Sequence, residues 1–161
     1  MKSPLPIAAL GLALLAAAPV AAVEADAIVG TWRTEDRHGN RDSIVEIARS
    51  GERYAGSVVW VKYEVYPEND PKGWAGRPLV DRENPDPALR ERPILGLRTL
   101  RGLRFEAGEW VDAEIYAPRE GETYRAKAWL EDPDTLKIRG YLGTPFLGRT
   151  VTWRRAEVPE R

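Results

Sequence analysis

Few side chains of this 161-residue chain combine the types and spacing that catalysis requires. Asp112 and Glu114 stand two positions apart and could act as the paired carboxylates of a glycosidase. Neighbouring cations would keep both carboxylates ionised, however, which disfavours the acid role. No Ser lies in a Gly-x-Ser-x-Gly setting, so the nucleophile elbow of a serine hydrolase is absent. The residues favour a non-enzymatic protein, and we assign no catalytic residue.

The sequence also offers little to a metal ion. His38 is the single histidine, and its turn-like surroundings "EDRHGN" indicate a solvated loop residue. Asp81, Glu83 and Asp86 place oxygen ligands at calcium-like intervals, but Asp86 stands where a calcium loop has glycine at its sixth position. The chain has no cysteine, which excludes disulfides and thiolate sites. We therefore predict no metal site and no cofactor.

The N-terminal segment has the pattern of an export signal. It carries Lys2, an apolar run over 5–20, and small residues at Val20 and Ala22. We predict cleavage after Ala22, with Ala27 as the alternative, a single domain over 23–161, and a periplasmic or secreted protein. The run is shorter than the roughly 20 apolar residues of a membrane span, so we expect no stable membrane insertion.

The charge balance argues against one class of partner. The whole chain has a formal net charge of −1, and loss of Lys2 makes the mature charge about −2. Nucleic-acid binders need an excess of Lys and Arg to neutralise phosphates. We therefore expect no nucleic-acid partner.

Short segments with alternating apolar residues recur along the chain, separated by turn residues such as Gly, Pro and Asp. They occupy 28–33, 43–49, 54–62, 97–105, 110–117, 123–130, 135–142 and 149–155. Many short strands without a long amphipathic helix are typical of a barrel or a sandwich. For this length we predict an all-β fold, a single small antiparallel β-barrel of about eight strands.

One long connection, rich in proline, interrupts this pattern over 63–96. Asp86 is suited to cap a helix, Pro87 to start it and Pro93 to end it, which predicts a helix of one or two turns. Connections this long are often lids or binding loops. The connection is either a lid whose Trp74 touches a ligand or a plug whose Trp74 completes the core, and we favour the plug.

The hairpin around 118–121 suggests a strand register. A four-residue loop places Tyr116 opposite Thr123. The pairs that follow are Glu114 with Arg125, Asp112 with Lys127, and Trp110 with Trp129, and in the next hairpin Lys127 with Arg139 and Arg125 with Tyr141. This charged face lies either in water or inside the barrel, where a cation would bind an anionic ligand head. Burial of so many charges is costly, which favours the outside.

The opposite face of these strands carries the small residues Ala113, Ala126, Ala128 and Gly140. The space above them is filled either by Trp32, Trp60 and Trp153 from other strands or by an apolar ligand, and we favour the tryptophans. The glycines of "GYLGTPFLGRT" serve either a tight hairpin loop or close approach to a ligand. We favour the hairpin loop.

Two resemblances bear on the fold. The start "VGTW" and the cations Arg154 and Arg155 resemble the lipocalin superfamily, whose first-strand tryptophan packs under a last-strand arginine; Arg149 is a third candidate for that arginine. "IVGTWRTED", "NPDPALRERPILGL", "IYAPREGETY" and "RGYLGTPFLGRTVTW" together resemble the exported bacterial domain of unknown function family 2147, from 28 to 153. That resemblance implies a secreted or periplasmic, lipocalin-like domain with no established activity.

We predict an exported, non-enzymatic barrel that binds a small apolar or amphipathic ligand. The predicted ligand-binding residues are Trp32, Trp60, Trp74, Tyr124, Arg139, Tyr141, Arg149 and Trp153. The alternative is a cell-envelope module that binds an envelope protein or a cell-wall polymer. Its binding face would be the exposed Trp/Arg-rich sheet with Trp110, Trp129 and Tyr141.

Overall fold

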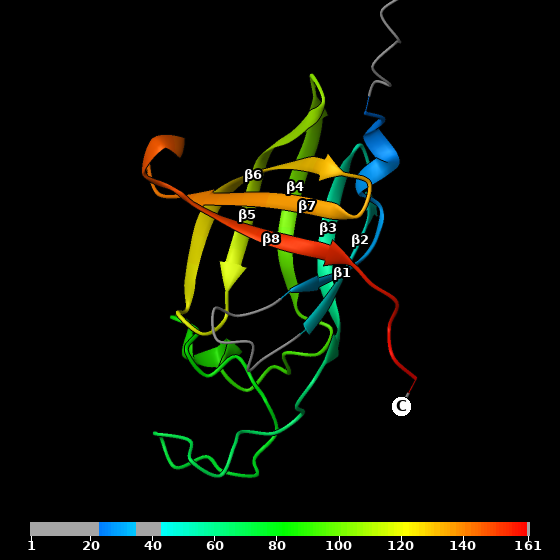
Figure 1. The fold of residues 1–161 in the computed structure, drawn as a ribbon. Helices are drawn as coiled ribbons and strands as arrows, with labels where there is room; N and C mark the ends of the chain where they lie inside the picture. The colour runs from blue at the N-terminus through cyan, green and yellow to red at the C-terminus, as the bar shows by residue number, and fades with distance from the viewer. Residues whose placement is uncertain (1–22, 35–42, 161) are drawn as a thin grey trace, which may run out of the picture.

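A computed structural model describes residues 23–34 and 43–160, and Figure 1 shows the fold. Within these residues eight antiparallel strands form a closed barrel in chain order, and β1 pairs with β8 to close it. The strands are β1 (Gly30–Thr34), β2 (Ser43–Ser50), β3 (Arg53–Val61), β4 (Arg98–Glu106), β5 (Glu109–Ala117), β6 (Glu122–Asp132), β7 (Thr135–Tyr141) and β8 (Arg149–Arg155). This confirms the predicted all-β barrel, and each predicted strand ends within about two residues of the observed one.

Some sequence predictions concern residues that the structure does not describe. The predicted signal peptide 1–22 and the turn with His38 lie outside the described residues. In the two described stretches, no helix has the length and apolar character needed to cross a membrane.

One end of the barrel is closed by the 3-10 helix η1 (Ala25–Ile28), at the top of Figure 1. The indole of Trp32 donates to the carbonyl of Ile28 at 2.9 Å, and the indole of Trp110 donates to the carbonyl of Ala25 at 3.1 Å. Both tryptophans are fully buried, and their polar N–H groups are thereby satisfied. Large aromatic side chains therefore fill this half of the barrel.

The closed end also holds the last-strand arginine that the lipocalin resemblance implies. The guanidinium carbon of Arg155 lies 4.1 Å from the ring centroid of Trp32. The same guanidinium donates to the carbonyls of Val29 and Ala27 at 3.1 and 3.0 Å. Arg155 therefore takes this role, whereas Arg149 is exposed at the opposite end of β8.

The predicted register is confirmed over most of the two hairpins. Tyr116 pairs with Thr123 and Glu114 with Arg125 in the β5–β6 hairpin. Lys127 pairs with Arg139 and Arg125 with Tyr141 in the β6–β7 hairpin. The charged face of these strands lies outside the barrel, as favoured from the sequence, because burial of its ions would be costly.

The register predictions for Trp110 and for Asp112 with Lys127 were wrong. Trp110 pairs with Ala128 instead of Trp129, because an irregularity lies between Trp110 and Ala113. Asp112 has a φ of 59° there, in the left-handed region that Asp tolerates better than most residues. The extra residue reverses the alternation, so Trp110 points into the core and is absent from the outer face.

The connection between β3 and β4, residues 62–97, lies at the other end of the barrel, at the bottom of Figure 1. Isolated bridges join Val65 to Pro78 and Val80 to Pro93, so the connection folds back on itself. It contains η2 (Pro87–Leu89), and the Asp86 carboxylate caps this helix by accepting from the amide of Ala88 at 3.0 Å. The predicted helix start is confirmed, although the helix is a single 3-10 turn.

Candidate functional site

A cavity of about 1180 Å³ lies between the open end of the barrel and the connection 62–97. The barrel contributes Val45, Val58, Val61, Ile115 and Trp153 to its lining. Four hydroxyl-bearing residues of the barrel, Thr34, Ser43, Thr99 and Tyr116, line it as well. The wall of the barrel is therefore mainly apolar where it faces the cavity.

The connection supplies a different chemistry to the same cavity. Tyr63, Tyr66, Leu79, Val80 and Ile94 line it together with Glu68, Arg82 and Glu83, and the β5–β6 turn adds Arg119. Among the described residues that line the cavity, every charged side chain comes from the connection or from this turn. The cavity is thus apolar on its barrel side and charged on its outer side.

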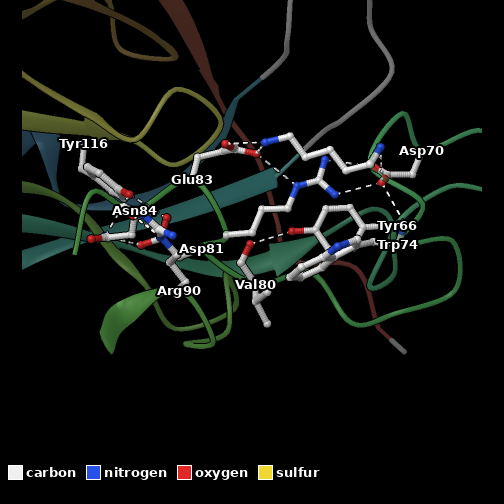
Figure 2. A network of polar contacts seen from close by, with 11 residues as sticks. Tyr66, Asp70, Trp74, Val80, Asp81, Glu83, Asn84, Arg90 and Tyr116 are labelled. Atoms are coloured by element: carbon white, nitrogen blue, oxygen red, sulfur yellow. Dashed lines mark hydrogen bonds and ion pairs between the residues drawn. The ribbon is translucent and has the colours of Figure 1, made fainter. Parts of the chain in front are cut away.

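The connection is anchored to the barrel through a buried carboxylate, Asp81, shown at the left of Figure 2. The hydroxyl of Tyr116, on β5, donates to Asp81 at 2.6 Å, and the amide of Asn84 donates to Asp81 at 2.8 Å. Arg92 completes the set with an ion pair of 2.7 Å. Burial, with the hydrogen bond to Asp81, raises the pKa of Tyr116 to about 12. This hydroxyl stays protonated and fastens the connection to β5.

A second polar cluster stiffens the outer part of the connection, at the right of Figure 2. Arg82 donates two hydrogen bonds of 2.9 Å to the carboxylate of Asp70. These bonds, with donation from the amides of Trp74 and Lys72, lower the pKa of Asp70 to about 2. Arg82 and Lys72 also pair with Glu83 at 3.2 and 2.6 Å. Arg82 therefore lines the cavity while it is ion-paired with Asp70 and Glu83.

The three carboxylates that resemble calcium ligands in the sequence do not converge. Asp81 binds Tyr116, Asn84 and Arg92, Glu83 pairs with Lys72 and Arg82, and Asp86 caps η2. No group of three His, Cys, Asp or Glu suited to a metal ion occurs in the part of the chain that the structure describes.

A protein-family match shows which family the chain belongs to. A family described as "Uncharacterized protein conserved in bacteria (DUF2147)" matches residues 30–155. The chain belongs to the DUF2147 family. The match covers all eight strands and the whole connection, as expected from the sequence motifs.

A solved structure shows the same fold as this DUF2147 chain. It is described as "Protein HP1028 from the human pathogen Helicobacter pylori belongs to the lipocalin family". The two chains are 22% identical, superpose with a TM-score of 0.65, and are each covered over 84% of their length. The barrel is therefore lipocalin-like. No curated protein gives a significant match.

Of the eight predicted ligand-binding residues, Trp153 lines the cavity of this DUF2147 protein. Trp32 lies at the closed end under Arg155, and Trp60 lies opposite Ile44 in the β2–β3 register. Tyr124 pairs with Ile115, and its hydroxyl donates to Glu120. These three residues do not line the cavity in the described structure.

Trp74 packs inside the connection. Its ring meets Tyr66 edge-on at 5.7 Å between centroids and lies 5.6 Å from the guanidinium of Arg82. It is half-buried, outside the barrel's core cluster and outside the lining of the cavity. Trp74 therefore does not complete the core of the barrel, as the plug interpretation predicts, but packs in a small core of the connection itself. Its contact with a ligand stays a prediction.

Arg139, Tyr141 and Arg149 lie together on the β7–β8 hairpin and away from the cavity lining. Arg139 donates to the carbonyls of Pro145 and Phe146. The β7–β8 segment is a structured hairpin loop, as favoured from the sequence, with the 3-10 helix η3 (Pro145–Leu147) at its tip.

Sequence reasoning missed most of the cavity lining. In their strands, Val58 and Ile115 alternate with residues that point outward. The two-residue period of a strand therefore predicts that both side chains point into the barrel. Tyr66 and Arg82 had no such signal, because the connection has no hydrophobic period that indicates how it folds back onto the barrel.

Proposed function

We propose that this DUF2147 protein binds a small apolar or amphipathic ligand in the cavity between the barrel and the connection 62–97. The observation that carries the proposal is the cavity itself, about 1180 Å³ and lined on its barrel side mainly by apolar residues. Small-molecule pockets are typically about 300–1,000 Å³ and mainly apolar with a few polar groups. The lipocalin-like fold supports the same function.

The lining also indicates how such a ligand would be oriented. Its apolar body lies against Val58, Ile115 and Trp153 on the barrel side. Its polar group lies toward Arg82 and Arg119 on the outer side, where charged residues line the cavity. Because Arg82 is already paired with Asp70 and Glu83, we expect a polar or zwitterionic group to bind there as readily as a carboxylate.

We also propose that the chain is exported and cleaved after Ala22, giving a periplasmic or secreted protein. The closed end supports this site over cleavage after Ala27. Cleavage after Ala27 would remove the Ala25 and Ala27 carbonyls, which accept from Trp110 and Arg155. The mass of the exported protein tests the assignment directly.

Native mass spectrometry tests the ligand proposal. The chain is exported to a bacterial periplasm with its own signal and purified without detergent. A small-molecule adduct that survives buffer exchange and is released on denaturation would support the proposal and give a mass to identify. Anilinonaphthalene sulfonate, a fluorescent amphiphile, then serves as a probe that occupies the emptied cavity.

A matched pair of variants tests whether the probe binds in this cavity. Val61→Phe adds volume to the cavity lining, whereas Val158→Phe makes the same change at an exposed residue near the C-terminus. We expect Val61→Phe to weaken probe binding by about tenfold or more, and Val158→Phe to leave it unchanged. Equal probe affinity in both variants would contradict binding in this cavity.

A further inference from the structure

The tip of the β7–β8 hairpin exposes three large apolar side chains. Leu142, Phe146 and Leu147 are 64%, 92% and 85% exposed. Figure 1 shows this hairpin projecting from the barrel at the left of the view. A cluster of this kind on a projecting loop marks a surface that meets an apolar partner.

The hairpin holds this tip in a defined conformation. Arg139 donates from Nε to the carbonyl of Pro145 at 2.6 Å and from Nη2 to the carbonyl of Phe146 at 3.2 Å. Gly148 packs so closely on β7 that an added Cβ would lie 2.6 Å from the carbonyl oxygen of Gly140. The Phe and Leu side chains therefore point outward from a braced backbone, so binding has to order these side chains but not the loop.

Three cations lie close to the apolar tip, although the whole chain has a net charge of −1. They are Arg139 and Arg149 of the hairpin and Arg125 of the neighbouring strand β6. Arg149 is exposed directly after the tip, and Arg125 of β6 lies beside Tyr141 at its base, 5.9 Å from the ring centroid. The apolar residues are thus flanked by positive charge on a chain that is otherwise acidic.

We propose that this hairpin, residues 139–149, is a docking element for the surface of an anionic lipid bilayer. Phe146, Leu147 and Leu142 enter the boundary between head groups and acyl chains, and Arg149 and Arg125 bind lipid phosphates. Aromatic and aliphatic side chains flanked by Lys and Arg are the chemistry of interfacial membrane binding.

The size of the tip favours a bilayer over a second copy of the chain. A stable protein interface needs about 800 Å² and 20–30 residues on each side. Three side chains on a projecting 3-10 turn fall well short of that, whereas a bilayer accepts a narrow wedge without needing a complementary surface.

Vesicle flotation of the exported, mature protein tests the proposal. We expect binding to vesicles of phosphatidylcholine and phosphatidylglycerol in roughly equal amounts, weaker binding to phosphatidylcholine alone, and a decrease with salt. The double variant F146S/L147S should lower the partition coefficient by about tenfold or more. The matched control L89S/L95S removes two exposed leucines of the connection and should bind as the wild type does.

Three further variants distinguish apolar insertion from electrostatic adsorption. Arg149→Glu should weaken binding to the mixed vesicles. Because the chain has no cysteine, Phe146→Cys and Leu95→Cys each provide a single site for an environment-sensitive dye. The dye at 146 should shift to shorter wavelength on the mixed vesicles, and the dye at 95 should not.

Three results would overturn the proposal. The first is a wild-type protein that does not float with the mixed vesicles. The second is loss of flotation in Arg149→Glu but not in F146S/L147S, which would show purely electrostatic adsorption. The third is a change of sedimentation coefficient in F146S/L147S without a change in flotation, which would show that the tip joins copies of the chain.

Discussion

At the scale of single residues, two carboxylates of the connection 62–97 shape the candidate site. Asp81 is fully buried. Its negative charge is compensated by hydrogen bonds from Tyr116 and Asn84 and by an ion pair with Arg92. Asp70 is buried under the guanidinium of Arg82. Removal of one partner from such a group leaves an uncompensated buried charge, which costs more than the pair itself contributes.

We predict that Tyr116→Phe destabilises the protein. The variant loses the donor to Asp81 and the acceptor for Asn84, at a cost of about 1–3 kcal/mol because both are buried. Urea unfolding measures the change. Tyr124→Phe is the matched control, since its hydroxyl binds Glu120 at the surface, and its effect should stay within about 0.5 kcal/mol.

We predict an acid-sensitive contribution from Asp70. The hydrogen bonds from Arg82 lower its pKa from 3.8 to about 2, so folding favours the ionised form. Its contribution to stability is present in full above about pH 4 and is lost as pH falls toward about 2. Thermal unfolding should therefore show Asp70→Asn less stable than wild type near neutral pH, with the difference shrinking over this window. A constant difference would contradict the prediction.

At the scale of elements, the connection is held against the β5–β6 turn by close contact. Gly121 has a φ of 70°, and an added Cβ would lie 2.0 Å from the backbone oxygen of Glu83. Glycine therefore serves both a left-handed turn and the approach of the connection. Glu83 and Arg119 both line the charged side of the cavity, so the position of that side depends on this contact.

We predict that Gly121→Ala loosens the connection. Strain at the positive φ and overlap with Glu83 should together lower the free energy of unfolding by about 2–4 kcal/mol. Gly51→Ala is the control, because Gly51 has a φ of 65° with nothing within 4 Å. That variant carries the strain alone and should lose about 1 kcal/mol. Limited proteolysis within 62–97 should increase in Gly121→Ala but not in Gly51→Ala.

At the scale of the whole molecule, the barrel has two unlike ends. Buried tryptophans and η1 close one end, and the cavity with its connection occupies the other. The contact between β1 and β8 closes the sheet, and Arg155 reinforces it by stacking on Trp32 and binding two carbonyls before β1. Closure removes free strand edges, which otherwise promote aggregation.

We predict that Arg155→Lys weakens barrel closure although it keeps the charge. Lysine cannot donate to Val29 and Ala27 while it also stacks on the Trp32 ring, so the loss should be about 1–3 kcal/mol. Arg154→Lys is the matched control, since the one side-chain hydrogen bond described for Arg154 is donated to Thr135. Equal melting temperatures for the two variants would argue against the role of Arg155.

The sequence by itself determined the strands and the register of two hairpins, apart from the irregularity near Asp112. A period of two and turn residues located all eight strands, and opposed charges placed Glu114 beside Arg125. That Trp32 meets a last-strand arginine was implied only by the resemblance to lipocalins. The strands and the two hairpin registers follow from local alternation and from neighbouring strands, which are short-range properties of the chain.

The tertiary structure alone decided where the cavity lies and what lines it. A single extra residue near Asp112 turned Trp110 inward, which alternation does not reveal. Tyr66, Arg82 and Asp81 reach the barrel through a connection without periodicity, so only long-range contacts such as Asp81 with Tyr116 position them. Most of the residues predicted to bind a ligand lie outside the lining of this cavity for the same reason: a cavity forms where distant segments meet, and residue spacing records only neighbours.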